Sequence, residues 1–132
     1  LAITEPSDKN KNPDWTAGVK MSKCPDGYYY IESSKRFRLR AGARDNEMIA
    51  VAKRDGVDTS VSIPIDAGAS GISAAHDLSK KFTNRGFICK QIRASNKSKL
   101  SRFTPFSAAA QNGLIRIVES GFSAEELDSR RF

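Results

Sequence analysis

Apolar positions alternate with small or polar ones over residues 15–21, which is the period of a half-buried strand. A turn signal at residues 24–27, with Gly27 available for a positive φ angle, precedes an aromatic and alternating segment at 28–37. The two alternating segments therefore predict a hairpin. Because residues 1–4 have the pattern of the end of a further apolar strand, we expect three antiparallel strands to open the domain.

The spacing of apolar residues becomes helical after residue 41. Apolar side chains three or four apart predict a helix over 41–54 and a second helix whose buried stripe runs from Ile72 to Phe82. The other expected elements are strands at 61–65, 87–92 and 114–118, a helix around 103–111, and a last helix that begins near Ser123 with a capping box. Three meandering strands followed by right-handed crossovers make a mixed α/β sheet flanked by helices, which is the order of the RNase H-like fold.

Length and composition are those of one folded domain. The chain has 132 residues, so we expect a single domain, residues 1–132, around one hydrophobic core. Hydrophobic residues make up 39% and charged residues 28%, which excludes a disordered chain. No apolar run reaches the roughly 18 residues of a membrane span, and no secretory signal opens the chain. A soluble intracellular domain without membrane contact is expected.

The residue types restrict the metals that the chain could hold. Two cysteines, Cys24 and Cys89, and one histidine, His76, cannot form a zinc site of the zinc-finger type. Any metal must therefore be held by carboxylates, which suits Mg²⁺ or Mn²⁺. His76 is expected to be a surface or packing residue of its helix. The sequence contains no phosphate-binding loop of the P-loop type, which excludes ATP binding by that route.

The charge balance favours a polyanion as partner. Lys and Arg number 22 against 15 Asp and Glu, a formal net charge of +7, and the simplest polyanion is nucleic acid. Lys97, Lys99 and Arg102 follow Arg93 in a basic segment between a strand and a helix, where cations can pair with phosphates. The alternative is a solvated basic loop. A second basic run, residues 35–40, is interpreted as a solvated strand end.

Asp66 is the foremost candidate for chemistry. It directly follows a predicted buried strand, at the position where open α/β sheets place ligands, and the small residues 67–71 leave room for a metal and a phosphate. The alternative is that Asp66 only starts a turn or caps the next helix. Asp14 lies with Asp8 and Glu5 in the first loop and is a candidate second metal ligand, although most loop acids are simply solvated.

Several segments in order resemble the carboxyl-terminal nuclease domain of bacteriophage and prophage large terminases. The resemblance extends from Leu1 to about Val118, and it depends on the order and spacing of the segments together. The segments that carry it are Leu1–Thr4, Asp14–Gly18, Tyr29–Ser33, Lys35–Arg38, Ser62–Gly68, Lys99–Ala109 and Gly113 before an apolar strand.

The resemblance implies a metal-dependent endonuclease that cleaves double-stranded DNA during genome packaging. In that family three acidic positions bind two divalent cations, here Mg²⁺ or Mn²⁺, and Asp66 matches the middle position. The first position is expected directly before Leu1 and the third beyond Phe132. The chain is accordingly expected to be truncated at both ends and to lack the ATPase domain. The strand of residues 1–4 is expected to end beside Asp66, in a shallow acidic pocket.

The resemblance also implies partners and a location. They are double-stranded DNA, the capsid portal and the small terminase subunit, in the bacterial host cytoplasm at the procapsid portal. The isolated domain is expected to be monomeric. Two alternatives stay open at this point: another RNase H-like DNA-processing nuclease, of the resolvase or transposase type, and a non-catalytic nucleic-acid-binding module built on the same sheet.

Overall fold

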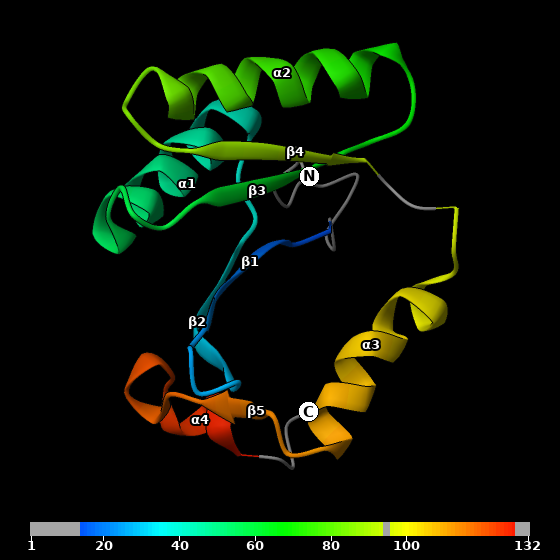
Figure 1. Ribbon diagram of the computed structural model, residues 1–132. Coiled ribbons are helices and arrows are strands. Elements are labelled where there is room, and N and C mark those ends of the chain that lie inside the picture. Colours follow the sequence, from blue (N-terminus) through cyan, green and yellow to red (C-terminus); the bar gives the residue numbers. More distant parts are fainter. Residues whose placement is uncertain (1–13, 94–95, 129–132) are drawn as a thin grey trace. The chain divides into compact units, whose positions relative to one another are not determined.

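The computed structural model describes residues 14–93 and 96–128 (Figure 1). Its elements are β1 (Thr16–Lys23), β2 (Tyr29–Phe37), α1 (Ala41–Asp55), β3 (Val61–Ile65), α2 (Ala69–Thr83), β4 (Cys89–Arg93), α3 (Lys99–Gln111), β5 (Ile115–Ile117), the 3-10 helix η1 (Glu119–Gly121) and α4 (Ala124–Leu127). This order confirms the predicted succession of strands and helices from residue 15 onward. The strand predicted at residues 1–4 lies outside the described residues.

The chain divides into two compact units, which we describe separately. The first comprises residues 1–16 and 37–96, and the second comprises residues 17–36 and 97–132. The strands of the described residues form a two-stranded sheet, β3–β4, and a three-stranded sheet, β1–β2–β5. The predicted class, a mixed α/β fold with helices flanking strands, is confirmed.

The core of the first unit lies between the β3–β4 pair and its helices. The strands pair in parallel, and α2 packs along both of them (Figure 1). Phe82 is completely buried, and its ring meets that of Phe87 edge to face at 6.3 Å between centroids. The predicted stripe of α2 is confirmed at three positions, but Ile72 is exposed because it belongs to the first turn of the helix, beyond the buried core. The buried apolar residues are Ile49, Ala52, Ile63, Ala75, Leu78, Phe82 and Phe87.

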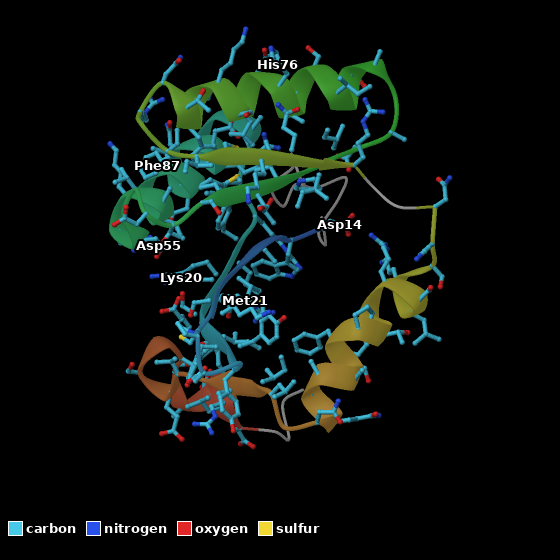
Figure 2. The ribbon with its side chains drawn as sticks, in the orientation of Figure 1. Asp14, Lys20, Met21, Asp55, His76 and Phe87 are labelled. Carbon is cyan, nitrogen blue, oxygen red and sulfur yellow. The ribbon has the colours of Figure 1, made fainter. Side chains whose placement is uncertain are left out.

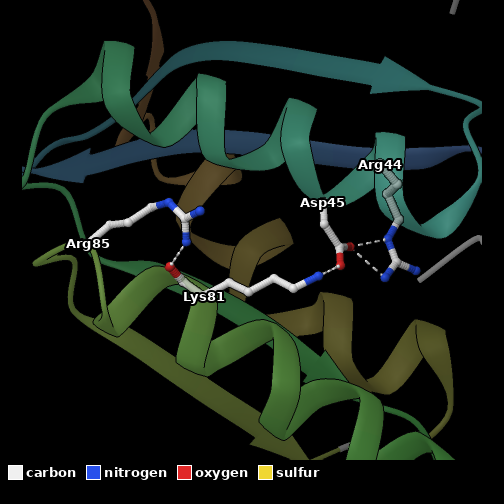
Figure 3. Close-up of polar contacts among 4 residues, drawn as sticks. All are labelled: Arg44, Asp45, Lys81 and Arg85. Carbon is white, nitrogen blue, oxygen red and sulfur yellow. Dashed lines mark hydrogen bonds and ion pairs between the residues drawn. The ribbon is translucent and has the colours of Figure 1, made fainter.

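The buried carboxylate of Asp45 on α1 pairs with Lys81 of α2 in the same unit (Figure 3). Asp45 Oδ1 accepts hydrogen bonds from Arg44 Nε at 2.9 Å and Nη2 at 2.7 Å, and Asp45 Oδ2 accepts one from Lys81 Nζ at 2.9 Å. The side chains of Arg44 and Asp45 are only 6% and 9% exposed. Asp45 therefore has its charge compensated by two cations, one of them from the other helix.

The second unit contains the hairpin that the sequence predicts. Gly27 has a φ of 89°, and its amide donates to the carbonyl of Cys24 at 3.0 Å, which closes the turn between β1 and β2. Strand β5 pairs in parallel with the other edge of β2, from Tyr29 opposite Ile115 to Ile31 opposite Ile117. The hydroxyl of Tyr30 donates to Asp26 at 3.0 Å, and this bond is the main reason that the pKa of Tyr30 is raised. The three-stranded sheet β1–β2–β5 therefore contains both a hairpin and a parallel pair of strands.

Two helix starts in the second unit are determined by serine caps. The Oγ of Ser98 accepts from the Ser101 amide at 3.1 Å, so α3 begins at Lys99 and not near Phe103 as predicted. The capping box predicted at Ser123 is confirmed, with the Glu126 carboxylate accepting from the Ser123 amide at 2.8 Å. The error at α3 arises because its first turn has too few apolar residues for a periodicity to register.

None of the helices in the described part is long and apolar enough to cross a membrane.

Candidate active site

Asp66 lies at the carboxyl edge of the β3–β4 sheet, as predicted. Strand β3 ends at Ile65, whose partner on β4 is Arg93, the last residue of that strand. Because the two strands are parallel, their carboxyl ends meet at one edge, and Asp66 and Arg93 lie there together with the start of α2. Asp66 is exposed. This is the edge at which open α/β sheets bind their ligands.

The backbone around Asp66 is held by two glycines. Gly68, the N-cap of α2, has a φ of 96°, a conformation that disfavours residues with a side chain. Gly71, in the first turn of α2, lies against Asp66 itself: a Cβ added to Gly71 would be 2.5 Å from the Asp66 carbonyl oxygen and 3.0 Å from the Asp66 Cβ. The small residues of this segment therefore do more than leave space in front of the sheet. They allow the helix to approach the backbone of Asp66.

Replacing Gly71 with alanine is expected to destabilise the protein and to displace Asp66. The added methyl group meets backbone atoms that cannot rotate away, and overpacking of this kind costs about 1–3 kcal/mol. Gly42, in the first turn of α1, is the matched control, because a Cβ there has nothing within 4 Å. Gly42→Ala should stabilise the helix by about 0.5–1 kcal/mol. Urea unfolding of both variants measures the difference, and a Gly71→Ala protein as stable as Gly42→Ala would contradict the close approach.

The other predicted metal ligands are placed only in part. Asp14 is exposed and lies two residues before the first residue of β1 (Figure 2), whereas Asp8 and Glu5 lie outside the described residues. The expected neighbourhood of Asp66 and residues 1–4 also lies outside them. Within residues 14–93 and 96–128 no group of three or more His, Cys, Asp or Glu is arranged to hold a metal ion. The metal-binding roles of Asp66 and Asp14 therefore stay predictions.

His76, the single histidine, lies on the outer side of α2, away from the sheet (Figure 2). Its side chain is exposed, as the sequence predicts. A general base needs a partner and a place near the reacting atoms. The position of His76 at the surface of the helix does not offer that place.

The predicted DNA-binding cations surround the start of α3 in the second unit. Lys97, Lys99 and Arg102 are all exposed, and Lys99 and Arg102 are three residues apart in the first helical turn. No residue of α3 is buried, and the helix exposes apolar side chains as well, with Leu100 79% exposed. The segment therefore combines cations with accessible apolar surface. Asp66 belongs to the first unit and these three cations to the second.

The structure distinguishes Arg38 by its contact with Trp15, which the sequence does not indicate. Within the basic run at 35–40, which is interpreted as a solvated strand end, Arg38 is partly buried. Its guanidinium lies over the ring of Trp15, with 4.0 Å from the Arg38 Cζ to the ring centroid. Trp15 was expected on the buried side of a strand but is 46% exposed. Alternation of apolar residues could not have found this pair, because it reports on neither the exposure of Trp15 nor the position of Arg38.

Comparison with protein families gives one result that covers nearly the whole chain. The sequence model of the family described as Terminase RNaseH-like domain matches residues 5–129. The matched range includes Asp66, Asp14 and the three cations at the start of α3. Searches of curated proteins and of solved structures found no match.

Proposed function

Because this chain belongs to the terminase RNaseH-like domain family, we propose that it cleaves double-stranded DNA with divalent metal ions when a phage genome is packaged. The observation that carries the proposal is the family match over residues 5–129. Two features of the chain support it. Asp66 is exposed at the carboxyl edge of a parallel strand pair, and the net charge of +7 suits a polyanionic substrate.

The metals that fit the chain are hard cations. Asp66 and Asp14 offer carboxylate oxygens, which are the ligands that Mg²⁺ and Mn²⁺ prefer. Asp66 would hold such a cation at the sheet edge, with Asp14 as a further ligand. Such cations would supply the activation of the attacking water and the stabilisation of the leaving oxygen of a phosphodiester. The role of the protein is to position the ligands, and the close approach of Gly71 to the Asp66 backbone contributes to this role.

Lys97, Lys99 and Arg102 are proposed to hold the DNA backbone. All three are exposed, and the first turn of α3 contains no acidic residue. Cations at a helix start are mildly unfavourable for the helix, since the dipole favours negative charge there. A phosphate bound between these side chains and the amides of that turn would place negative charge at the helix start and so compensate the unfavourable cations. Such contacts determine where the duplex lies and carry no base specificity.

The proposed partners follow from the family. A terminase acts with the capsid portal and the small terminase subunit, at the procapsid portal in the bacterial host cytoplasm. We propose these partners and this location for the protein, and a monomeric state for the domain on its own. A resolvase or transposase role has no support comparable to the terminase family match. The non-catalytic binding module is the alternative that the following experiment separates.

Incubation of the protein with supercoiled plasmid is expected to give nicked and linear DNA in the presence of Mn²⁺ or Mg²⁺. Excess EDTA should prevent the reaction, because it removes the cations that are proposed to activate the attacking water and to stabilise the leaving oxygen. Agarose gels measure the conversion. Binding of the plasmid without cleavage at any metal concentration would favour the non-catalytic module, and cleavage that continues in EDTA would refute the metal dependence.

A further inference from the structure

Arg38 and Trp15 form a stacked pair in the first unit that the proposed DNA contacts at α3 do not include. The Arg38 guanidinium lies over the Trp15 ring at 4.0 Å, and the Arg38 Nε atom is buried without a hydrogen-bond partner. Trp15 is nevertheless 46% exposed, so the pair borders the solvent. Asp14, a candidate metal ligand, immediately precedes Trp15 in the chain.

The guanidinium of Arg38 has donors that the rest of the described chain does not use. An arginine carries five N–H donors in a planar fork and stays charged at all ordinary pH values. No hydrogen bond or ion pair joins Arg38 to a residue in the described part of the chain, Asp14 included. A buried donor without an acceptor is unfavourable, and in native proteins it calls for a ligand, an ion or a water.

Arg44, six residues further along the chain, differs from Arg38 in that its guanidinium is paired with a carboxylate. It is also an arginine near the start of α1, and its guanidinium donates twice to the buried carboxylate of Asp45. That charge is compensated within the fold. Arg38 is held in place by an aromatic ring instead, which orients the guanidinium without neutralising it.

We propose that Trp15 and Arg38 form a phosphate-binding site that takes a backbone phosphate of duplex DNA. The site rests on the proposed function and adds a DNA contact beside Asp14, in the same unit as Asp66. The planar fork of arginine matches two phosphate oxygens, and a guanidinium stacked on an indole loses little freedom when it binds. The same chemistry would accept inorganic phosphate, so the experiment includes both anions.

Trp15 is the only tryptophan of the chain, so tryptophan emission of the isolated 132-residue chain reports on this site alone. The chain is titrated in EDTA with a duplex oligonucleotide, to prevent cleavage, and separately with inorganic phosphate. Binding is followed both by Trp15 emission and by the anisotropy of labelled DNA over a range of salt concentrations. The variants are Arg38→Gln, Arg38→Lys and, as a matched loss of one exposed charge, Lys53→Gln.

Duplex DNA is expected to change Trp15 emission in the parent and in Lys53→Gln. In Arg38→Gln the emission change should disappear, affinity should fall about tenfold, and the slope of log affinity against log salt should decrease by about 0.9. Arg38→Lys should keep the slope, because the charge remains, but bind more weakly because the fork is lost. Circular dichroism of each variant verifies the fold, and the lysine variant keeps the test decisive if glutamine impairs folding.

The outcomes separate this site from the proposed function. If the parent binds DNA and Arg38→Gln binds with the same affinity, slope and emission change, the site is refuted and the nuclease proposal stands. If the parent binds no DNA but phosphate alone changes Trp15 emission in an Arg38-dependent way, an anion site is retained and duplex DNA as its ligand is refuted, whereas the nuclease proposal depends on the plasmid assay. If neither anion changes the emission, the site is refuted.

Discussion

Replacing Asp66 with alanine is expected to abolish metal-dependent DNA cleavage by the protein. Asp66 is an exposed carboxylate at the carboxyl edge of the β3–β4 pair and is our foremost candidate ligand. Loss of even an outer-shell partner of a metal ligand lowers metal affinity or activity about 10- to 100-fold, so loss of a direct ligand should cost more than about 100-fold. The rate of plasmid conversion in Mn²⁺, compared between parent and variant, gives the measurement.

The fold of this variant should be intact. Removing an exposed carboxylate usually changes the free energy of unfolding by no more than about 0.5 kcal/mol. Asp58→Ala, which removes another exposed aspartate of the first unit, is the matched control and should cleave at the parental rate. A normal cleavage rate in Asp66→Ala would refute the metal-ligand role, and an equal loss in Asp58→Ala would show that the effect is not specific to the sheet edge.

Replacing Asp45 with alanine is expected to cause a large loss of stability, about 3–5 kcal/mol. The substitution removes the carboxylate that accepts from Arg44 and from Lys81 while the Arg44 side chain, only 6% exposed, keeps its charge. Arg44 then loses the carboxylate to which it donates two hydrogen bonds, so the desolvation cost of its buried charge is less well compensated. Urea unfolding measures the change, and thermal unfolding should show a Tm lower by roughly 10 °C or more.

Glu47 provides the control for this prediction on the same helix. Its ion pair with Arg54 is longer, 3.5 Å, and both side chains are exposed, so Glu47→Ala should change stability by less than about 1 kcal/mol. The comparison separates burial of the pair from the mere removal of an acid on α1. Equal stabilities of the two variants would contradict the claim that the buried carboxylate of Asp45 stabilises the fold through Arg44 and Lys81.

The sequence alone determined the order of the elements and the place of Asp66. Alternation at 15–21 and 28–37 predicts the hairpin, and spacing of three or four predicts α1 and α2, because each pattern follows from the backbone geometry of its own segment. Asp66 could be placed at a strand end for the same reason. The capping box at Ser123 is equally local, since its two hydrogen bonds join residues three apart.

Contacts between distant segments were decided only by the tertiary structure. Asp45 and Lys81 are 36 residues apart, and no pattern on either helix indicates that the two meet. The same holds for Gly71 against the Asp66 backbone, for the Arg38 guanidinium over Trp15, and for the parallel pairing of β5 with β2. Periodicity states which side of an element is apolar, but not which other element covers it. That choice depends on the packing of all segments together, so a charge becomes a buried partner or a ligand site only once the chain has folded.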